Sequence, residues 1–118
     1  MKSEKYKEFR EQFIKKTFDL SDAKRIEYTE GNQDADVHTN FRRIGEELGL
    51  SPLKIIAVYL LKHIKSLLTF FKLGQTFSNE SIESRVSDIV NYLILFLAYL
   101  HYDNVKETDD RPEKRRNK

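Results

Sequence analysis

The sequence predicts an all-α fold, an antiparallel helical bundle with two long apolar helices. Apolar residues recur at helical spacing through most of the 118 residues, and no segment shows the alternation of a β-strand. The four Gly and two Pro residues are too few for a glycine-rich or proline-rich low-complexity chain. We expect one helical domain at residues 1–103 and a disordered charged tail at residues 104–118, which has too few apolar residues to order itself.

The first third of the chain predicts two helices and a loop. Apolar residues at helical spacing between Lys and Glu predict an amphipathic helix over residues 2–18. Ser21 or Asp22 can cap a short second helix that runs to about Tyr28. Residues 29–36 have a turn-rich composition, which predicts the longest internal loop.

The middle of the chain carries clear helix boundaries. Asp36 is the expected N-cap of a helix that ends at Gly49. Ser51 and Pro52 then begin a long helix, because Ser caps helices well and Pro is tolerated at the first helical position. This long helix is expected to stop at Gly74.

The last long helix is expected from Ser78 or Asn79 to about Tyr102. Both long helices are apolar on more than one face, whereas a surface helix shows a single apolar stripe. Only shorter helices are available to cover them. The sequence therefore predicts a homo-oligomer that forms through the two long helices.

Several classes of chemistry are excluded by composition. The chain has no Cys, which excludes disulfides, thiolate nucleophiles and Cys-based metal sites. There is no glycine-rich phosphate loop, no strained nucleophile turn and no paired His spacing of a zinc site. No apolar stretch reaches the length that crosses a bilayer, and the first ten residues resemble no signal peptide. We expect a soluble cytoplasmic protein without a membrane partner.

The formal net charge of +2 belongs to the tail. Residues 104–118 hold six Lys and Arg against four Asp and Glu, which leaves residues 1–103 neutral. A neutral folded body lacks the basic footprint on which duplex binding depends, so nucleic acid is not an expected partner. The pattern favours a local cationic site for a small anion.

Polar residues inside the two apolar helices form the candidate site. On the first, Lys62 and His63 lie in one patch with Tyr59 and Ser66, and on the second a stripe of similar spacing holds the remaining candidates. The stripe comprises Ser84, Arg85, Asp88, Asn91 and Tyr92. One interpretation is structural, with His63 or Lys62 paired to Asp88. The other is functional, with Lys62, His63 and Arg85 as donors to an anion.

A second set lies where the loop meets the helix after it, where backbone N–H groups can bind an anion. It comprises Tyr28, Asp36, His38, Asn40 and Phe41. Glu80 and Asp88 could hold a metal ion, and Mg²⁺ is the candidate because it needs only one or two carboxylates beside ligand phosphates. No other cofactor is expected.

The order of these residues resembles a family of small helical phage and prophage proteins labelled "nucleotide modification associated". The resemblance covers residues 24–100 and lies in the following elements: Tyr28, Asp36, Asn40-Phe41, Lys62-His63, Asn79-Glu80, Arg85, Asp88 and Asn91-Tyr92. It implies a phage or prophage origin, action in the cytoplasm of an infected or lysogenic bacterial host, and a nucleotide or nucleotide-derived ligand held by those residues.

A more distant similarity is to the all-α nucleoside triphosphate pyrophosphatases of the MazG type. That family carries Glu-Glu-x-x-Glu and Glu-x-x-Asp elements for magnesium. Here Leu50 follows Glu46-Glu47 where the third Glu belongs, and Arg85 precedes Asp88 where a Glu belongs.

Three functions follow as hypotheses. The first is a non-catalytic nucleotide-binding protein, such as an anti-defence sponge for a host nucleotide signal. Lys62, His63 and Arg85 would bind phosphate, Asp88 and Asn91 would bind ribose or base edges, and Phe41 or Tyr92 would stack on the base. The second is a Mg²⁺-dependent pyrophosphohydrolase with Asp88, Glu80 and Glu47 as metal ligands. The third is a helical protein-interaction module.

Overall fold

The computed structural model describes residues 1–28, 31, 36–76, 78 and 80–103, without the side chains of Tyr28 and Asp103. Every regular element in this part of the chain is helical, which confirms the all-α prediction. The predicted tail, residues 104–118, lies outside the described residues. So do Asn79 and most of the predicted loop at residues 29–36. No helix that the structure describes is both long and apolar enough to cross a membrane.

The chain divides into two compact units, Met1–Val37 and His38–Lys118. The single domain expected over residues 1–103 stays a prediction. Each unit is described separately below.

The first unit is one helix, α1 (Ser3–Tyr28), of 26 residues. The prediction of two helices with a break near residues 18–22 is therefore wrong. Ser21 and Asp22 are good caps, but they also tolerate a helix interior, and the chain has no Gly or Pro before Gly31 to force an end. Lys15 supports the continuous helix by donating a hydrogen bond of 2.6 Å to Asp19 one turn later.

The second unit begins with α2 (Thr39–Leu48). Its N-cap is His38, whose side chain makes no capping hydrogen bond, so the predicted N-cap at Asp36 is wrong by two residues. The ring of His38 is almost completely buried, and its Nε2 donates a hydrogen bond of 2.9 Å to the carbonyl oxygen of Leu95. Tertiary packing of this ring sets the start of α2 in place of a local capping bond. The helix ends at Gly49, as predicted, in a left-handed conformation.

The long helix α3 (Pro52–Leu73) has the boundaries expected from sequence. Ser51 Oγ accepts a hydrogen bond from the backbone N–H of Lys54, and Pro52 occupies the first turn. Gly74 closes the helix in a left-handed conformation and donates its N–H to the carbonyl oxygen of Phe70.

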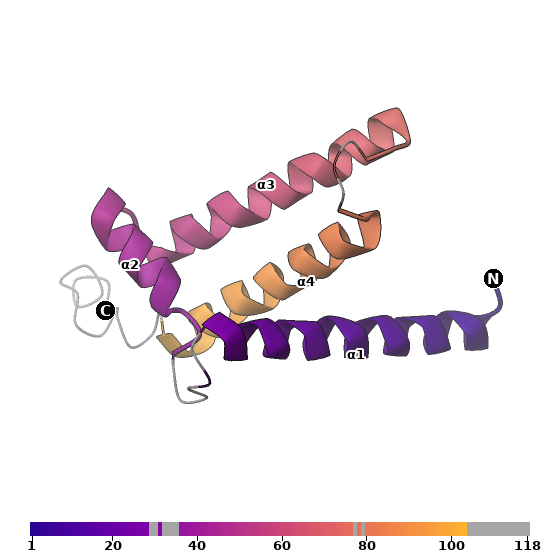
Figure 1. Ribbon diagram of the computed structural model, residues 1–118, viewed down its shortest axis with the longest axis horizontal. Coiled ribbons are helices and arrows are strands. Elements are labelled where there is room, and N and C mark those ends of the chain that lie inside the picture. The colour runs from indigo at the N-terminus through magenta and orange to yellow at the C-terminus, as the bar shows by residue number, and fades with distance from the viewer. Residues whose placement is uncertain (29–30, 32–35, 77, 79, 104–118) are drawn as a thin grey trace, which may run out of the picture. The chain divides into compact units, whose positions relative to one another are not determined.

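The last α-helix, α4 (Ile82–Ala98), begins later than predicted. Ser81 is the N-cap and accepts a hydrogen bond of 3.1 Å from the N–H of Ser84, which places the start beyond Ser78 and Asn79. A π-helical segment, η1 (Tyr99–Asp103), continues α4 past the expected end at Tyr102 by one residue. Helices α3 and α4 run side by side in Figure 1 and pack as an antiparallel hairpin, with α2 packed against α3.

The core of the second unit lies at the end of this hairpin that faces α2. Its fully buried apolar side chains are Phe41, Ile55, Ile56 and Tyr99. Half-buried apolar side chains surround them: Ile44, Leu53, Tyr59, Tyr92, Leu95 and Phe96. The turn between α2 and α3 is tight, because a Cβ atom at Gly45 would overlap the carbonyl oxygen of Leu50. Gly45 therefore allows a close approach of backbone to backbone.

Candidate functional site

The two polar stripes predicted on the long helices meet across the hairpin. His63 on α3 places its Nδ1 3.8 Å from Oδ2 of Asp88 on α4, which is within ion-pair range but too long for a hydrogen bond. The side chain of His63 is only 13% exposed. The antiparallel pairing of the helices brings these two residues together, although they lie 25 positions apart in the sequence.

An aromatic ladder leads from this pair to the core. The ring of Tyr92 stacks on His63 at 5.4 Å and on Tyr59 at 5.9 Å between ring centroids. Phe41 packs edge-on against both tyrosines. The ladder then continues through His38 to Tyr99, whose rings meet at 5.3 Å. Ring stacking and burial therefore fix the position of His63 from one side.

The ladder bears on two predicted roles. Phe41 is buried in the core, and Tyr92 contacts the rings of Phe41, Tyr59 and His63. These rings pack against protein side chains in the structure. Stacking of a nucleotide base on Phe41 or Tyr92 stays a prediction. Such stacking would require the rings of the ladder to rearrange.

Arg85 lies one turn before Asp88 on α4, and its side chain is only 12% exposed. Its Nη2 donates a hydrogen bond of 2.6 Å to Oγ of Ser78, and its Nη1 lies 3.9 Å from Oε2 of Glu80. Within the described part of the chain, no acceptor is within hydrogen-bonding distance of its buried Nε. One hydrogen bond thus holds the guanidinium group in place, and the group has further N–H donors that this bond does not use.

The remaining candidates lie in different surroundings. Lys62 is exposed on α3 beside His63, and Asn91 is half-buried on α4. Asn40 is exposed on α2. Tyr28 and Asp36 belong to the first unit, so they are not placed relative to the hairpin. The structure therefore brings together His63, Asp88 and Tyr92, with Arg85 one turn away.

The predicted metal ligands have other neighbours. Glu80 lies beside Arg85, and Asp88 lies beside His63. Over residues 1–28, 31, 36–76, 78 and 80–103, the side chains of His, Asp and Glu form no cluster of three or more that could hold a metal ion. Glu47, the third carboxylate of the pyrophosphohydrolase hypothesis, is exposed on α2. The Mg²⁺ site stays a prediction.

Two contacts around the candidate site do not follow from the sequence. Ser78, the hydrogen-bond partner of Arg85, is predicted only as a helix start, and because it lies before α4, helical spacing does not place it beside Arg85. His38 belongs to the set predicted where the loop meets the helix, and in the structure it is a buried ring that contacts Tyr99 and Leu95. A His that follows a Val directly before a helix gives no local indication of such a long-range partner.

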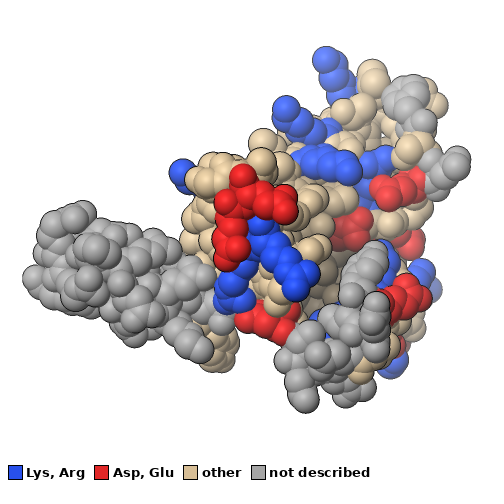
Figure 2. All heavy atoms as spheres, turned by 60° about the vertical axis from the view of Figure 1, so that its left-hand side comes forward, with Lys and Arg blue, Asp and Glu red and all other residues tan. Residues whose placement is uncertain are grey.

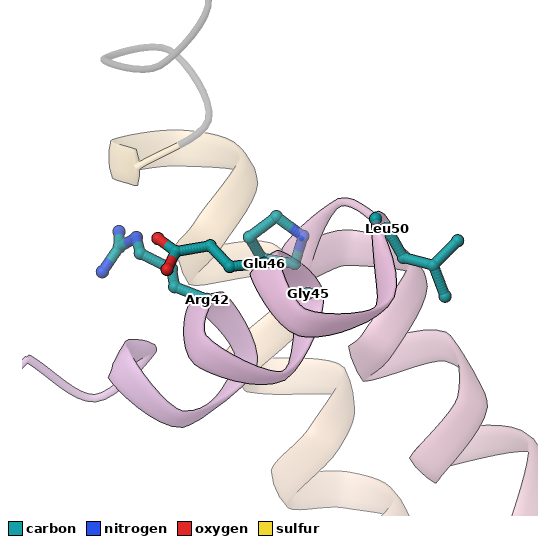
Figure 3. Close-up of a pocket in the computed structure, with 6 residues that line it drawn as sticks. Arg42, Gly45, Glu46 and Leu50 are labelled. Atoms are coloured by element: carbon teal, nitrogen blue, oxygen red, sulfur yellow. The ribbon is translucent and has the colours of Figure 1, made fainter.

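An open cavity of about 370 Å³ lies elsewhere, at the turn between α2 and α3. It is lined by Arg42, Gly45, Glu46, Gly49, Leu50 and Pro52. Figure 3 shows the side chains of Arg42 and Glu46 on one side of it and Leu50 on the other. It contains none of the residues predicted for the site. We give more weight to the polar stripes, because the charged side chains that converge there are largely buried.

Comparison with protein-family models, with curated proteins and with solved structures finds no match to this chain.

Proposed function

We propose that the protein binds a nucleotide or a nucleotide-derived anion, without turnover, at the polar end of the α3–α4 hairpin. The observation that carries the proposal is the partly buried guanidinium of Arg85, one turn from the His63–Asp88 pair. Its Nε has no acceptor among the described residues, and its Nη1 is too far from Glu80 for a hydrogen bond. A phosphate oxygen is the acceptor that a planar guanidinium group binds best.

The neighbouring residues fit an anionic ligand. His63 adds a ring N–H donor, and the exposed Lys62 adds a mobile ammonium group at the rim. Asp88 faces His63 at 3.8 Å and has a carboxylate oxygen that can accept from a ribose hydroxyl. Glu80 is exposed and can turn away from Arg85 when a phosphate group takes its place.

Oligomerisation is part of the proposal. Helix α4 exposes Leu93, Ile94 and Leu97 and carries no lysine, so two copies can meet there without like charges facing each other. The family resemblance adds a phage or prophage origin and a place of action in the bacterial cytoplasm. Binding without catalysis would then sequester a host nucleotide signal.

Isothermal titration of the full chain with ATP, GTP and cyclic di-GMP tests the proposal. We expect Arg85→Gln to weaken the affinity for the best of these probes by about tenfold or more, because a charge-assisted hydrogen bond to phosphate is lost. The exposed Arg43→Gln on α2 is the matched control and should bind as the parent does. Failure of all three probes to bind, or equal binding by the two variants, would contradict the proposal.

Mass spectrometry of small molecules that copurify with the protein complements this titration. It needs no assumption about the ligand, and a nucleotide lost from Arg85→Gln but retained by Arg43→Gln would support the site. Release of pyrophosphate from ATP with Mg²⁺, abolished by Asp88→Asn, would instead support the enzymatic hypothesis.

A further inference from the structure

Helix α3 carries a second apolar surface that the hairpin does not use. We define the outer seam as Ala57, Leu61, Ile64, Leu68 and Phe71. Successive members are four, three, four and three residues apart, which is the 3.5-residue repeat of a helix that packs along another helix. The residues of α3 that contact α4, such as Tyr59 and His63, lie on a different face.

The outer seam is exposed over most of its length. Leu61 is 53%, Leu68 is 57% and Phe71 is 70% exposed, and Ala57 is exposed as well. Only Ile64 is half-buried. Large apolar side chains that are aligned in one row, rather than scattered, mark an interaction surface.

A strip of lysines borders the seam. Helix α3 contains Lys54, Lys62, Lys65 and Lys72, all exposed, and no Asp or Glu among its 22 residues. At 100° per residue these lysines lie on one side of the seam, whereas Leu60 and Leu67, on its other side, are half-buried. Figure 2 shows blue side chains along the upper part of the second unit, at the height where α3 runs in Figure 1.

The charge of this surface favours an acidic partner over a second copy in antiparallel contact. A second copy of α3 in antiparallel contact would bring lysine strips together, and like charges across an interface cost affinity. None of the other described helices carries more than one net negative charge. Helix α1 holds seven basic and six acidic residues, α2 holds two of each, and α4 holds only Glu83 and Asp88 beside Arg85.

The width of the seam argues against a lipid surface. A helix that lies in a membrane interface presents a wide apolar face with cationic side chains on its polar side. The outer seam is a narrow row of side chains, and Val58 is a further exposed apolar side chain on the flank that carries the lysines. This narrow surface fits one partner helix better than a bilayer.

We propose that the outer seam of α3 docks an amphipathic helix of another protein, one with an apolar row and acidic residues beside it. The apolar row packs on Leu61, Leu68 and Phe71, and its carboxylates pair with Lys65 and Lys72. The lysine strip shares Lys62 with the site around Arg85, but the docking contacts proposed here use Lys65 and Lys72, so either proposal can fail without the other.

A charge-swap experiment tests this inference. The probes are two labelled peptides of about three heptads, with Leu at the a and d positions and either Glu or Lys at the e and g positions. Fluorescence anisotropy with the full chain should show binding of the Glu peptide. We expect Lys65→Glu combined with Lys72→Glu to weaken this binding by about tenfold or more and to create binding of the Lys peptide.

Two further variants complete the test. Leu61→Gln combined with Leu68→Gln should abolish binding of both peptides, since it removes the apolar row, and circular dichroism should show unchanged helicity because both residues are exposed. The control Lys5→Glu combined with Lys7→Glu on α1 should bind as the parent does.

Other outcomes would overturn the inference. These are no binding of the Glu peptide, equal binding of both peptides by the parent, and binding to phosphatidylglycerol vesicles that the charge-swap variant loses while the peptide does not bind. A dimer in analytical ultracentrifugation that Leu61→Gln with Leu68→Gln dissociates would assign the seam to a second copy instead.

Discussion

The two ends of the α3–α4 hairpin are built on different principles. At the end that faces α2, Ile56, Tyr99 and the ring of His38 are almost completely buried. At the other end, His63 and Arg85 keep a small exposed area and meet charged partners at 3.8–3.9 Å. Burial makes the first end a source of stability. The loosely paired charges of the second end contribute little to stability and can exchange partners.

The largest expected effect is on the buried end. Ile56→Ala should lower the free energy of unfolding by about 2–5 kcal/mol, because it removes a buried side chain and leaves a cavity. Urea denaturation followed by circular dichroism measures the change. Leu61→Ala, an exposed truncation on the same helix, should change it by only about 0.5 kcal/mol. Equal losses of unfolding free energy for the two variants would mean that another contact covers Leu61.

Gly45→Ala tests the tight turn beside the buried end. Helix propensity alone predicts that Ala in α2 stabilises by about 1 kcal/mol. The overlap of its Cβ with the carbonyl oxygen of Leu50 predicts a loss of about 1–3 kcal/mol instead. Thermal denaturation gives the sign, and a rise in melting temperature would show that the turn can open at little cost.

His38→Leu should cost about 0.5–1.5 kcal/mol, because it removes one buried hydrogen bond while a side chain of similar bulk fills the space. The backbone N–H of Tyr99 still donates to Leu95, which limits the loss. Affinity for ATP should not change, because His38 lies at the other end of the ladder. If His38→Leu changed the affinity for ATP without changing the stability, His38 would belong to the ligand-binding site.

At the polar end, Asp88→Asn should change the free energy of unfolding by less than about 1 kcal/mol, because the pair with His63 is long and partly exposed. ATP affinity should shift several-fold, because the proposed site uses Asp88 beside His63 to accept from a ribose hydroxyl. Calorimetry and urea denaturation of the same sample separate the two quantities. A large loss of stability would mean that the polar end stabilises the fold as the buried core does.

The smallest effect belongs to α1. The hydrogen bond to Asp19 and its charge raise the pKa of Lys15 above its ordinary value of 10.5. A raised pKa means that the pairing stabilises the helix below pH 10.5 and that the contribution disappears as the pH rises through the shifted value. Asp19→Asn should lower the helicity slightly at pH 7, and this effect should shrink as the pH rises above 10.5 through the raised pKa of Lys15. An effect that does not depend on pH would point to helix propensity rather than to charge.

Local features of the sequence predicted local features of the fold. Gly49, Ser51, Pro52 and Gly74 end or begin helices through contacts within a few residues, so the pattern alone places these boundaries. The start of α2 could not be placed in this way, since His38 is held by Leu95, 57 residues away. The periodic spacing of apolar residues cannot locate a helix boundary that a tertiary contact sets.

The same distinction holds for the candidate site. Helical spacing alone could place Arg85 and Asp88 on one face, and the meeting of His63 with Asp88 followed from an antiparallel pairing of helices. The ladder through Tyr92, Tyr59 and Phe41 could not be predicted, because the sequence does not give the rotation of each helix. That rotation decides which aromatic rings pack inside and which remain at the surface.

The hydrogen bond between His38 and Leu95 has a kinetic consequence. Helices α3 and α4 are consecutive, so their pairing closes a short loop and can form early, whereas the contact from His38 must close most of the second unit. We expect the hairpin to be formed in the transition state for folding and the buried ring of His38 to dock afterwards. A substitution at His38 should then speed unfolding and leave the folding rate nearly unchanged. The docked ring of His38 therefore lengthens the lifetime of the native state.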